Sequence, residues 1–135
     1  MSNATRQLIE QYYAAFNAAD WDAFMALLTE DVVHDVNEGA REGGREAFGQ
    51  FMERMNRSYR EHISNITVMV NEDGSRAAAE YIVEGTYLQT DEGLPEARGQ
   101  QYRLPGGAFF DIRDGKVARV TNYYNLQEWI RQVEG

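Results

Sequence analysis

The sequence contains no cysteine, which excludes disulfides, thiol nucleophiles and cysteine-ligated zinc or iron–sulfur sites. It has only two histidines, His34 and His62, too few for a histidine-rich metal cluster. We therefore predict that the protein uses neither a metal nor another cofactor. Basic residues are also scarce: 13 Lys and Arg face 22 Asp and Glu, a formal net charge of -9. Such a chain repels phosphate backbones and anionic lipid surfaces, so we expect no nucleic-acid and no membrane partner.

Long hydrophobic runs are missing as well. No apolar stretch approaches the length that crosses a bilayer, and the first residues lack the apolar segment of a signal peptide. We therefore expect a cytoplasmic protein. The chain has 135 residues, of which 43% are hydrophobic, with six Phe, eight Tyr and two Trp. This composition predicts one globular domain over residues 1–135.

The spacing of apolar residues predicts helices first and strands afterwards. Helical spacing covers residues 8–16, 21–28, 48–59 and 126–133, with Asp20 and Asn125 as helix caps. Alternation predicts strands over 32–36, 62–70, 79–87, 98–113 and 116–124, with a bulge in the Pro-Gly-Gly stretch at 105–107. This order indicates an α+β fold in which N-terminal helices pack on a bent, mixed or antiparallel sheet. The result is a cone, and its open end is a usual place for a small-molecule pocket.

Two parts of the chain resemble the NTF2-like (cystatin-like) superfamily: residues 12–22 with 27–32, and residues 109–117 with the Tyr pair at 123–124. The chain looks most similar to the SnoaL-like branch and, within it, to ketosteroid isomerase-related proteins. Residues 34–39, 55–61 and 121–126 suggest that group. The resemblance covers nearly the whole chain and implies the cone fold. For activity it implies several options: an isomerase, a cyclase, a dehydratase, an epoxide hydrolase or a binding protein.

True ketosteroid isomerases use a tyrosine on the first helix, an aspartate base and a second, protonated aspartate. By resemblance, Tyr12 matches the tyrosine. The base position falls on Val36, with Asp35 one residue before it, and the second acid falls near Ala108. Since Val and Ala cannot move protons, two of the three functional positions are missing.

His34 is the strongest single candidate for acid–base chemistry. It shares strand parity with Val36 and should face the inside of the cone, where its pKa suits proton transfer at neutral pH. The alternative is a neutral core histidine. Asp35 has the opposite parity and faces inward only if the strand bulges; otherwise it lies on the surface. Tyr12 and Asn122 could orient a ligand, or they could serve only as structural residues.

Other side chains are candidates for the wall of the pocket, although an aromatic stripe can also be plain core. Acidic residues beside Arg41, Arg57 and Arg60, including Glu61, are typical of solvated ion pairs or loop anchors. The candidate pocket residues are Phe16, Val36, Tyr59, Tyr81, Val83, Tyr87, Tyr102, Phe110, Asn122 and Tyr124.

Two hypotheses of function follow. In the first, the protein binds a hydrophobic carbonyl compound in the cone and catalyses a cofactor-free proton transfer, with His34, Tyr12 and Asp35 as catalytic candidates. In the second, it is a non-catalytic ligand-binding or dimerisation module. We also expect a homodimer through the uncovered side of the sheet, where alternation places Val117, Thr121, Tyr123, Ile82 and Leu88.

Overall fold

The computed structural model describes residues 2–37 and 39–134. Its elements are α1 (Ser2–Asn17), α2 (Trp21–Ala26), β1 (Leu28–Asp35), β2 (Arg41–Gly43), α3 (Arg45–Ser58), β3 (Tyr59–Val70), β4 (Arg76–Tyr87), β5 (Gln101–Arg113), β6 (Lys116–Tyr124) and α4 (Leu126–Glu134). Helices precede the long strands, as the spacing of apolar residues predicts. The short strand β2 shows no clear alternation and is not predicted. β3 begins at Tyr59 rather than at residue 62.

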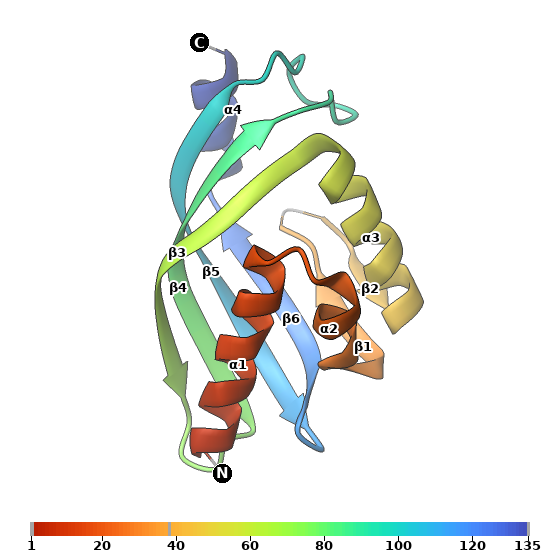
Figure 1. The fold of residues 1–135 in the computed structure, drawn as a ribbon, viewed down its shortest axis with the longest axis vertical. Coiled ribbons are helices and arrows are strands. Elements are labelled where there is room, and N and C mark those ends of the chain that lie inside the picture. Colours follow the sequence, from red (N-terminus) through yellow and green to blue (C-terminus); the bar gives the residue numbers. More distant parts are fainter. Residues whose placement is uncertain (1, 38, 135) are drawn as a thin grey trace.

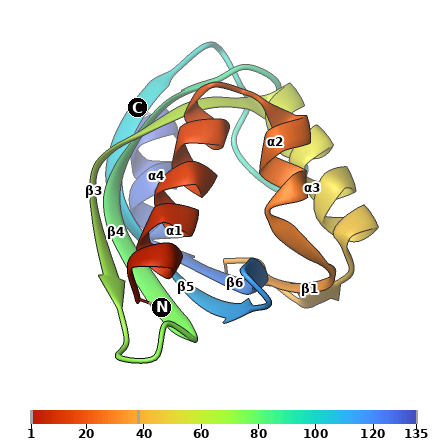
Figure 2. The ribbon, with the colours of Figure 1, turned by 60° about the horizontal axis from the view of Figure 1, so that its bottom comes forward.

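The six strands form one sheet in the order β2-β1-β6-β5-β4-β3. β1 runs parallel to β6, whereas β1–β2 and the three pairs from β3 to β6 are antiparallel. The sheet is strongly curved, and α1, α2 and α3 lie on its concave side (Figure 1; Figure 2). The α+β class and the bent mixed sheet covered by helices are therefore confirmed.

Alternate side chains of the long strands point to the concave side and form the core. On β5, Phe110 is fully buried. α1 covers it with Tyr12 and Tyr13, whose ring centroids lie 5.3 and 6.3 Å from that of Phe110. Each such aromatic side chain stabilises the fold by about 1.5–3 kcal/mol when it leaves water. The helix–sheet layer thus depends on rings that pack edge-on between α1 and β5.

The convex side of the sheet carries charged side chains that pair across strands. Arg76 on β4 and Arg119 on β6 both bind Asp111 on β5, each at 2.9 Å. Arg41 on β2 binds Asp35 on β1 at 2.6 Å. Pairs of this kind contribute little stability individually because water competes for them. They do cancel the charge of a surface that helices leave uncovered.

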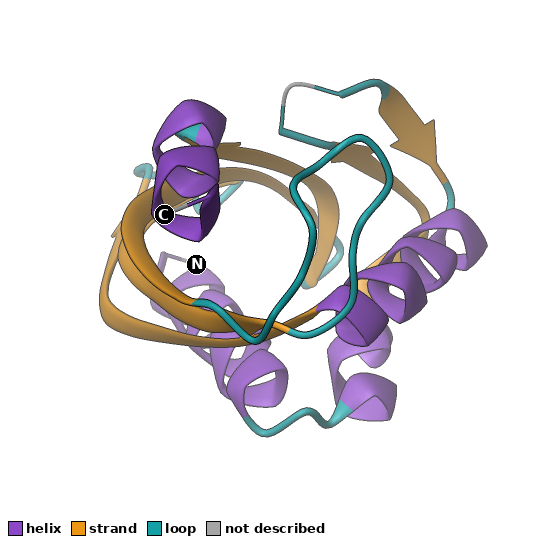
Figure 3. Cartoon of the chain, turned by 90° about the horizontal axis from the view of Figure 1, so that it is seen from above, coloured by secondary structure: helices purple, strands orange, loops and turns teal. Residues whose placement is uncertain are grey.

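α4 and the loop after β4 lie over one end of the curved sheet (Figure 3). Trp129 of α4 packs edge-on against Tyr59, Tyr87 and Tyr102, with ring centroids 5.8, 4.9 and 5.7 Å away. The Tyr59 hydroxyl donates a hydrogen bond of 2.7 Å to Asp91 in the loop. This end of the sheet is therefore covered by aromatic packing that is anchored through buried phenols.

Both predicted helix caps are confirmed. Asp20 Oδ1 accepts a hydrogen bond from the Ala23 amide at the start of α2, and Asn125 Oδ1 accepts one from the Glu128 amide at the start of α4. None of the described helices combines the length and the hydropathy needed to cross a membrane.

The bulge predicted in the Pro-Gly-Gly stretch is wrong. β5 pairs with β4 there without a register shift, and the shift lies between Asp111 and Ile112 instead. Gly106 is the last residue on that side that pairs with β6, so the missing N–H of Pro105 loses no ladder hydrogen bond to β6. Val117 is fully buried in the core, whereas regular alternation places it on the convex side. Strand irregularity overrides alternation at this position.

We predict that the convex side is a homodimer interface. Phe109 and Tyr123 are 47% and 57% exposed there, with ring centroids 5.8 Å apart. A two-fold contact would bury both rings of each protomer. Tyr123→Glu should convert dimer into monomer in light scattering at micromolar concentration. Gln11→Glu, which adds the same charge on the exposed face of α1, should leave the mass unchanged. A monomeric wild-type protein would contradict this prediction.

Candidate functional site

Two tyrosines from neighbouring strands lie across the concave side, each over a glycine of the other strand. Tyr81 of β4 pairs with Gly106 of β5, and Tyr102 of β5 pairs with Gly85 of β4. A Cβ on Gly106 would lie 2.7 Å from Tyr81 Cε1, and a Cβ on Gly85 would overlap the Tyr102 hydroxyl. Because Gly85 and Gly106 have no side chain, the space above them is free for the two tyrosine rings.

A carboxyl group from the neighbouring strand β3 contacts one of these tyrosines. Glu61 of β3 stands opposite Gly85, and its Oε2 accepts a 2.5 Å hydrogen bond from the Tyr102 hydroxyl. Burial raises the pKa of Glu61, while the Tyr102 hydrogen bond opposes the shift. Burial, and then the charge of Glu61, raise the pKa of Tyr81, so that phenol remains a neutral donor. A carboxyl and two phenols thus share one part of the concave side. We call Glu61, Tyr81 and Tyr102 the carboxyl–phenol group.

His34 of β1 points to the concave side but is only 2% exposed. Its ring stacks on Phe48 at 4.4 Å and meets Phe51 edge-on at 4.6 Å, both from α3. The Nε2 atom lies 3.2 Å from Asn122 Nδ2, and Nδ1 has no partner in the described part of the chain. Burial lowers the pKa of His34, so the ring is neutral at pH 7. The geometry matches a core histidine that contacts the site through Asn122.

Asn122 of β6 connects this buried ring to the accessible part of the concave side. The side chain is half-buried, and its one hydrogen bond to the described residues uses Nδ2. Its Oδ1 is free of partners within residues 2–37 and 39–134. An amide held in this way can accept from a ligand, or donate after a flip of its two terminal atoms.

Tyr12 of α1 lies beneath the same region. Its ring packs against Tyr13, Phe24 and Phe110 at 5.1, 4.6 and 5.3 Å. Burial raises its pKa, and Tyr81 adds to the shift, so the two phenols lie within electrostatic reach. The predicted orienting tyrosine therefore does face the concave side, although its ring is largely a core element.

Asp35 faces the other side of the sheet. Arg41 binds its two oxygens at 2.6 and 3.0 Å, and the Thr121 hydroxyl donates to it at 2.5 Å. These partners lower the pKa of Asp35 to about 2, with the Arg41 hydrogen bonds as the largest cause. The sheet separates Asp35 from His34 and Tyr12, so it cannot contact a ligand that they share.

The predicted wall residues divide into three groups. Buried core positions hold Val83, Tyr87 and Phe110, and Tyr59 is tied to the loop after β4. Two others lie away from the carboxyl–phenol group: Phe16 packs on Trp21 between α1 and α2, and Val36 follows the end of β1. The third group lies on the concave side: Tyr81 and Tyr102 belong to the carboxyl–phenol group, the partly exposed Tyr124 interacts electrostatically with Tyr81, and Asn122 contacts His34.

Glu61 is the candidate that sequence reasoning misses. Helical spacing extends to Tyr59, which leaves Glu61 between two elements as a solvated partner of arginine. That interpretation is wrong, because no ion pair of the described residues includes Glu61. The available signal is the alternation of Tyr59, Glu61 and Ile63, which places the carboxyl on the same side as two buried residues.

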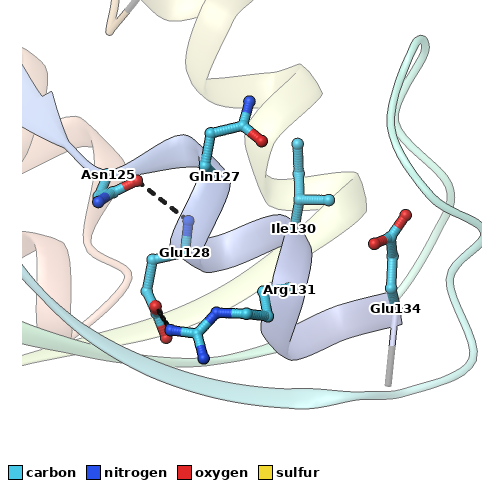
Figure 4. A pocket seen from close by; sticks show the side chains of 6 residues that line it. All are labelled: Asn125, Gln127, Glu128, Ile130, Arg131 and Glu134. Carbon is cyan, nitrogen blue, oxygen red and sulfur yellow. Dashed lines mark hydrogen bonds and ion pairs between the residues drawn. The ribbon is translucent and has the colours of Figure 1, made fainter.

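Two surface grooves lie away from this site. One, of about 470 Å³, runs along α4 and is lined by Asn125, Gln127, Glu128, Ile130, Arg131 and Glu134 (Figure 4). The other, of about 520 Å³, lies between α1 and β3 and is lined by residues that include Arg6, Glu10 and Tyr13. Within the described residues, no three His, Asp or Glu side chains are grouped to hold a metal ion.

The chain is similar to a known protein family and to several solved structures. The family model of the SnoaL-like domain matches residues 9–120. A proposed polyketide cyclase from Xanthomonas campestris pv. campestris is 60% identical, with a TM-score of 0.95 and 98% of each chain covered. A second proposed polyketide cyclase, from Pseudomonas putida KT2440, is 62% identical, with a TM-score of 0.94 over 96% of this chain and 97% of that one.

A proposed ketosteroid isomerase from Kribbella flavida DSM 17836 is 28% identical, with a TM-score of 0.65 over 92% of this chain and 79% of that one. No curated protein matches the chain significantly. The likeness to the two proposed polyketide cyclases covers nearly all of both chains.

Gly85→Ala should destabilise the protein by about 1–3 kcal/mol, because the new methyl group displaces the Tyr102 ring and approaches Glu61 Cγ to 2.9 Å. Gly43→Ala is the matched control on β2, where a Cβ meets nothing within 4 Å. Its effect should stay within about 0.5 kcal/mol. Urea unfolding of both variants measures the difference, and equal midpoints would refute the tight fit at Gly85.

The buried His34 should make stability sensitive to mild acid. Its folded pKa is lowered, so the unfolded chain binds a proton first, and stability falls as the pH drops below 6.5 toward the folded pKa. His34→Phe keeps an aromatic ring but cannot titrate, so that part of the pH dependence should disappear. His62→Phe changes the exposed histidine and should retain it. Thermal melts at pH 7.5 and 5.5 distinguish the two results; an unchanged slope in His34→Phe would contradict burial of a neutral ring.

Proposed function

This chain belongs to the SnoaL-like domain family, and on that premise we propose that it binds a hydrophobic carbonyl compound and transfers a proton on it without a cofactor. One observation carries the proposal. Glu61, Tyr81 and Asn122 come from three strands, point to the concave side and keep partial solvent exposure amid buried aromatic rings. An apolar site with a few convergent polar groups is the usual design for recognising a small ligand.

The polar groups suit a carbonyl oxygen. The Tyr81 phenol is neutral, since its pKa is raised, and it donates a hydrogen bond at any physiological pH. We assign the second contact to the Asn122 amide, which points to the same concave side and contacts His34. A donor aimed at a carbonyl oxygen stabilises the charge that develops there when a neighbouring carbon loses a proton. This arrangement favours compounds that can form an enolate.

The relatives point to the same substrate class. Two proposed polyketide cyclases are 60% and 62% identical to this chain over almost its whole length. Polyketide chains carry ketones whose adjacent carbons are acidic, and a cyclisation begins by removing such a proton. By resemblance, the two isomerase acids fall on Val36 and near Ala108, so the proposed reaction here uses other groups.

A non-catalytic binding module is the second candidate. The observation that favours it is the degree of filling: Tyr12, Tyr13 and His34 are almost completely buried on the concave side. The groove along α4 and the groove between α1 and β3 also lie elsewhere on the surface. A protein that holds its ligand without reacting would need only the contacts and not an acid–base group.

Deuterium exchange into 2-tetralone tests the proposal. This small hydrophobic ketone has acidic protons beside its carbonyl, and their loss in D2O is followed by proton NMR. We expect the wild-type protein to accelerate the exchange above the buffer rate and to bind the ketone, detected by Trp fluorescence. Asn122→Ala should slow the exchange about tenfold, the value of one hydrogen bond of about 1.4 kcal/mol.

Gln127→Ala on the exposed face of α4 is the control and should exchange at the wild-type rate. Binding of the ketone with no acceleration would establish the second candidate instead. Absence of both binding and acceleration would overturn both functions for this class of ligand.

A further inference from the structure

Glu61 occupies a position that its environment makes unusual for a carboxyl group. It lies on the concave side of β3, half-buried, and no Arg, Lys or His of the described residues forms an ion pair with it. The other acids whose ion pairs are known, such as Asp35 and Asp111, lie on the convex side or at the surface. An acid without a counter-ion is costly to bury, so its retention calls for a physical role.

The fold holds this carboxyl by one oxygen. Gly85 of β4 separates Glu61 from Tyr102, and its missing side chain lets β3 and β5 make a direct 2.5 Å hydrogen bond across it. Trp129 of α4 packs edge-on against the Tyr102 ring, with the two ring centroids 5.7 Å apart. Tyr102 is therefore fixed as a donor to Oε2. The remaining oxygen, Oε1, has no hydrogen bond to any residue in 2–37 or 39–134.

The groups that surround Glu61 are phenols and an indole. Tyr81 of β4 and Tyr102 of β5 interact with its charge directly. Tyr124 of β6 acts on Tyr81, and Trp129 of α4 acts on Tyr102. Phenols and indoles never carry a positive charge, so none of these side chains is a counter-ion for Glu61. Tyr81 thus lies within electrostatic reach of the Glu61 carboxyl on the concave side.

We propose that Glu61 is the catalytic base of this protein, with Oε1 taking a proton from the carbon next to the ligand's carbonyl while Tyr81 donates to the carbonyl oxygen. In this step the C–H bond breaks and its electron pair forms a C=C bond. The C=O π pair moves to the oxygen, and the proton forms an O–H bond on Glu61. Return of that proton from Glu61 to the α-carbon of the enolate re-forms the C=O bond and completes the transfer. This assignment rests on the proposed function.

Two further properties agree with this role. Burial raises the pKa of Glu61 and so makes its carboxylate a stronger base than an ordinary glutamate. Tyr102 is a positioning residue, since it contacts Glu61 and not the ligand, and its hydrogen bond lowers the same pKa. Activity should therefore rise with pH as Glu61 loses its proton.

Exchange into 2-tetralone with Glu61→Gln is the direct test. We expect exchange to fall by about a hundredfold to ten-thousandfold, the usual effect of losing a positioned base. The affinity for 2-tetralone should change by less than tenfold. Glu80→Gln is the matched control, since Glu80 is exposed on β4, and its exchange rate should be unaffected. Tyr102→Phe should move the rising limb of the pH profile to higher pH, because the hydrogen bond that lowers the Glu61 pKa is lost.

The outcomes separate this assignment from the function beneath it. If wild-type protein accelerates exchange and Glu61→Gln does so equally, the function stands and Glu61 is not the base. If wild-type protein does not accelerate exchange, the proton-transfer function and this assignment both fail. Should Glu61→Gln not fold, Glu61→Asp retracts the carboxylate by one methylene, and an exchange rate equal to wild type would overturn the assignment.

A readout without ligand complements these assays. The raised pKa means that the folded state holds the Glu61 proton more tightly than the unfolded chain does. The stability from this group is thus present below pH 4.5 and lost as the pH rises through the folded pKa. Glu61→Gln should therefore gain stability relative to wild type across that range. A difference in stability between Glu61→Gln and wild type that does not change with pH would contradict the raised pKa of Glu61.

Discussion

The reciprocal Tyr–Gly pairs between β4 and β5 are the constraint on which the site depends. Tyr81 lies over Gly106 and Tyr102 over Gly85, so each strand leaves a gap that the ring of the other strand fills. Glycine in a strand normally weakens it, and a covering aromatic ring restores the lost packing. Because each ring lies over the glycine of the other strand, this pairing also sets the direction of both hydroxyls. With a larger residue in place of either glycine, the rings could not lie across the neighbouring strand, and the Tyr102 hydroxyl could not reach Glu61.

The curved sheet separates charges by side. The convex side carries Asp35 and Asp111, each matched by arginine, so their charges are compensated and their pKa values are low. The concave side carries Glu61 with phenols alone, and its pKa is raised. The same functional group therefore has opposite acid–base character on the two faces of one layer. This contrast follows from what lies within a few ångströms of each carboxyl and not from the residue type.

The layers of the fold could be predicted because each long element buries one face, and spacing alone records that burial. The helix caps Asp20 and Asn125 were equally readable, since a side chain three residues before an amide is a local signal. Local sequence signals do not predict the burial or contacts of a residue when these depend on how strands distant in the sequence pair. Val117 is buried because of an irregularity in pairing, and the role of Gly85 appears only when the register of β3, β4 and β5 is known. The inward direction of His34 was predictable by parity, but its depth beneath Phe48 depends on α3 and was not.

The parallel pairing of β1 with β6 bears on how the chain acquires its fold. Contacts such as His34 with Asn122 join residues 88 positions apart. A ribosome adds about 5–20 residues per second, so β1 leaves it roughly 4–18 s before its partner strand does. During that interval one edge of β1 has exposed amide and carbonyl groups, the kind of surface that chaperones cover and that other unfolded chains can bind. Biogenesis of this protein is therefore most vulnerable while β6 is still being made.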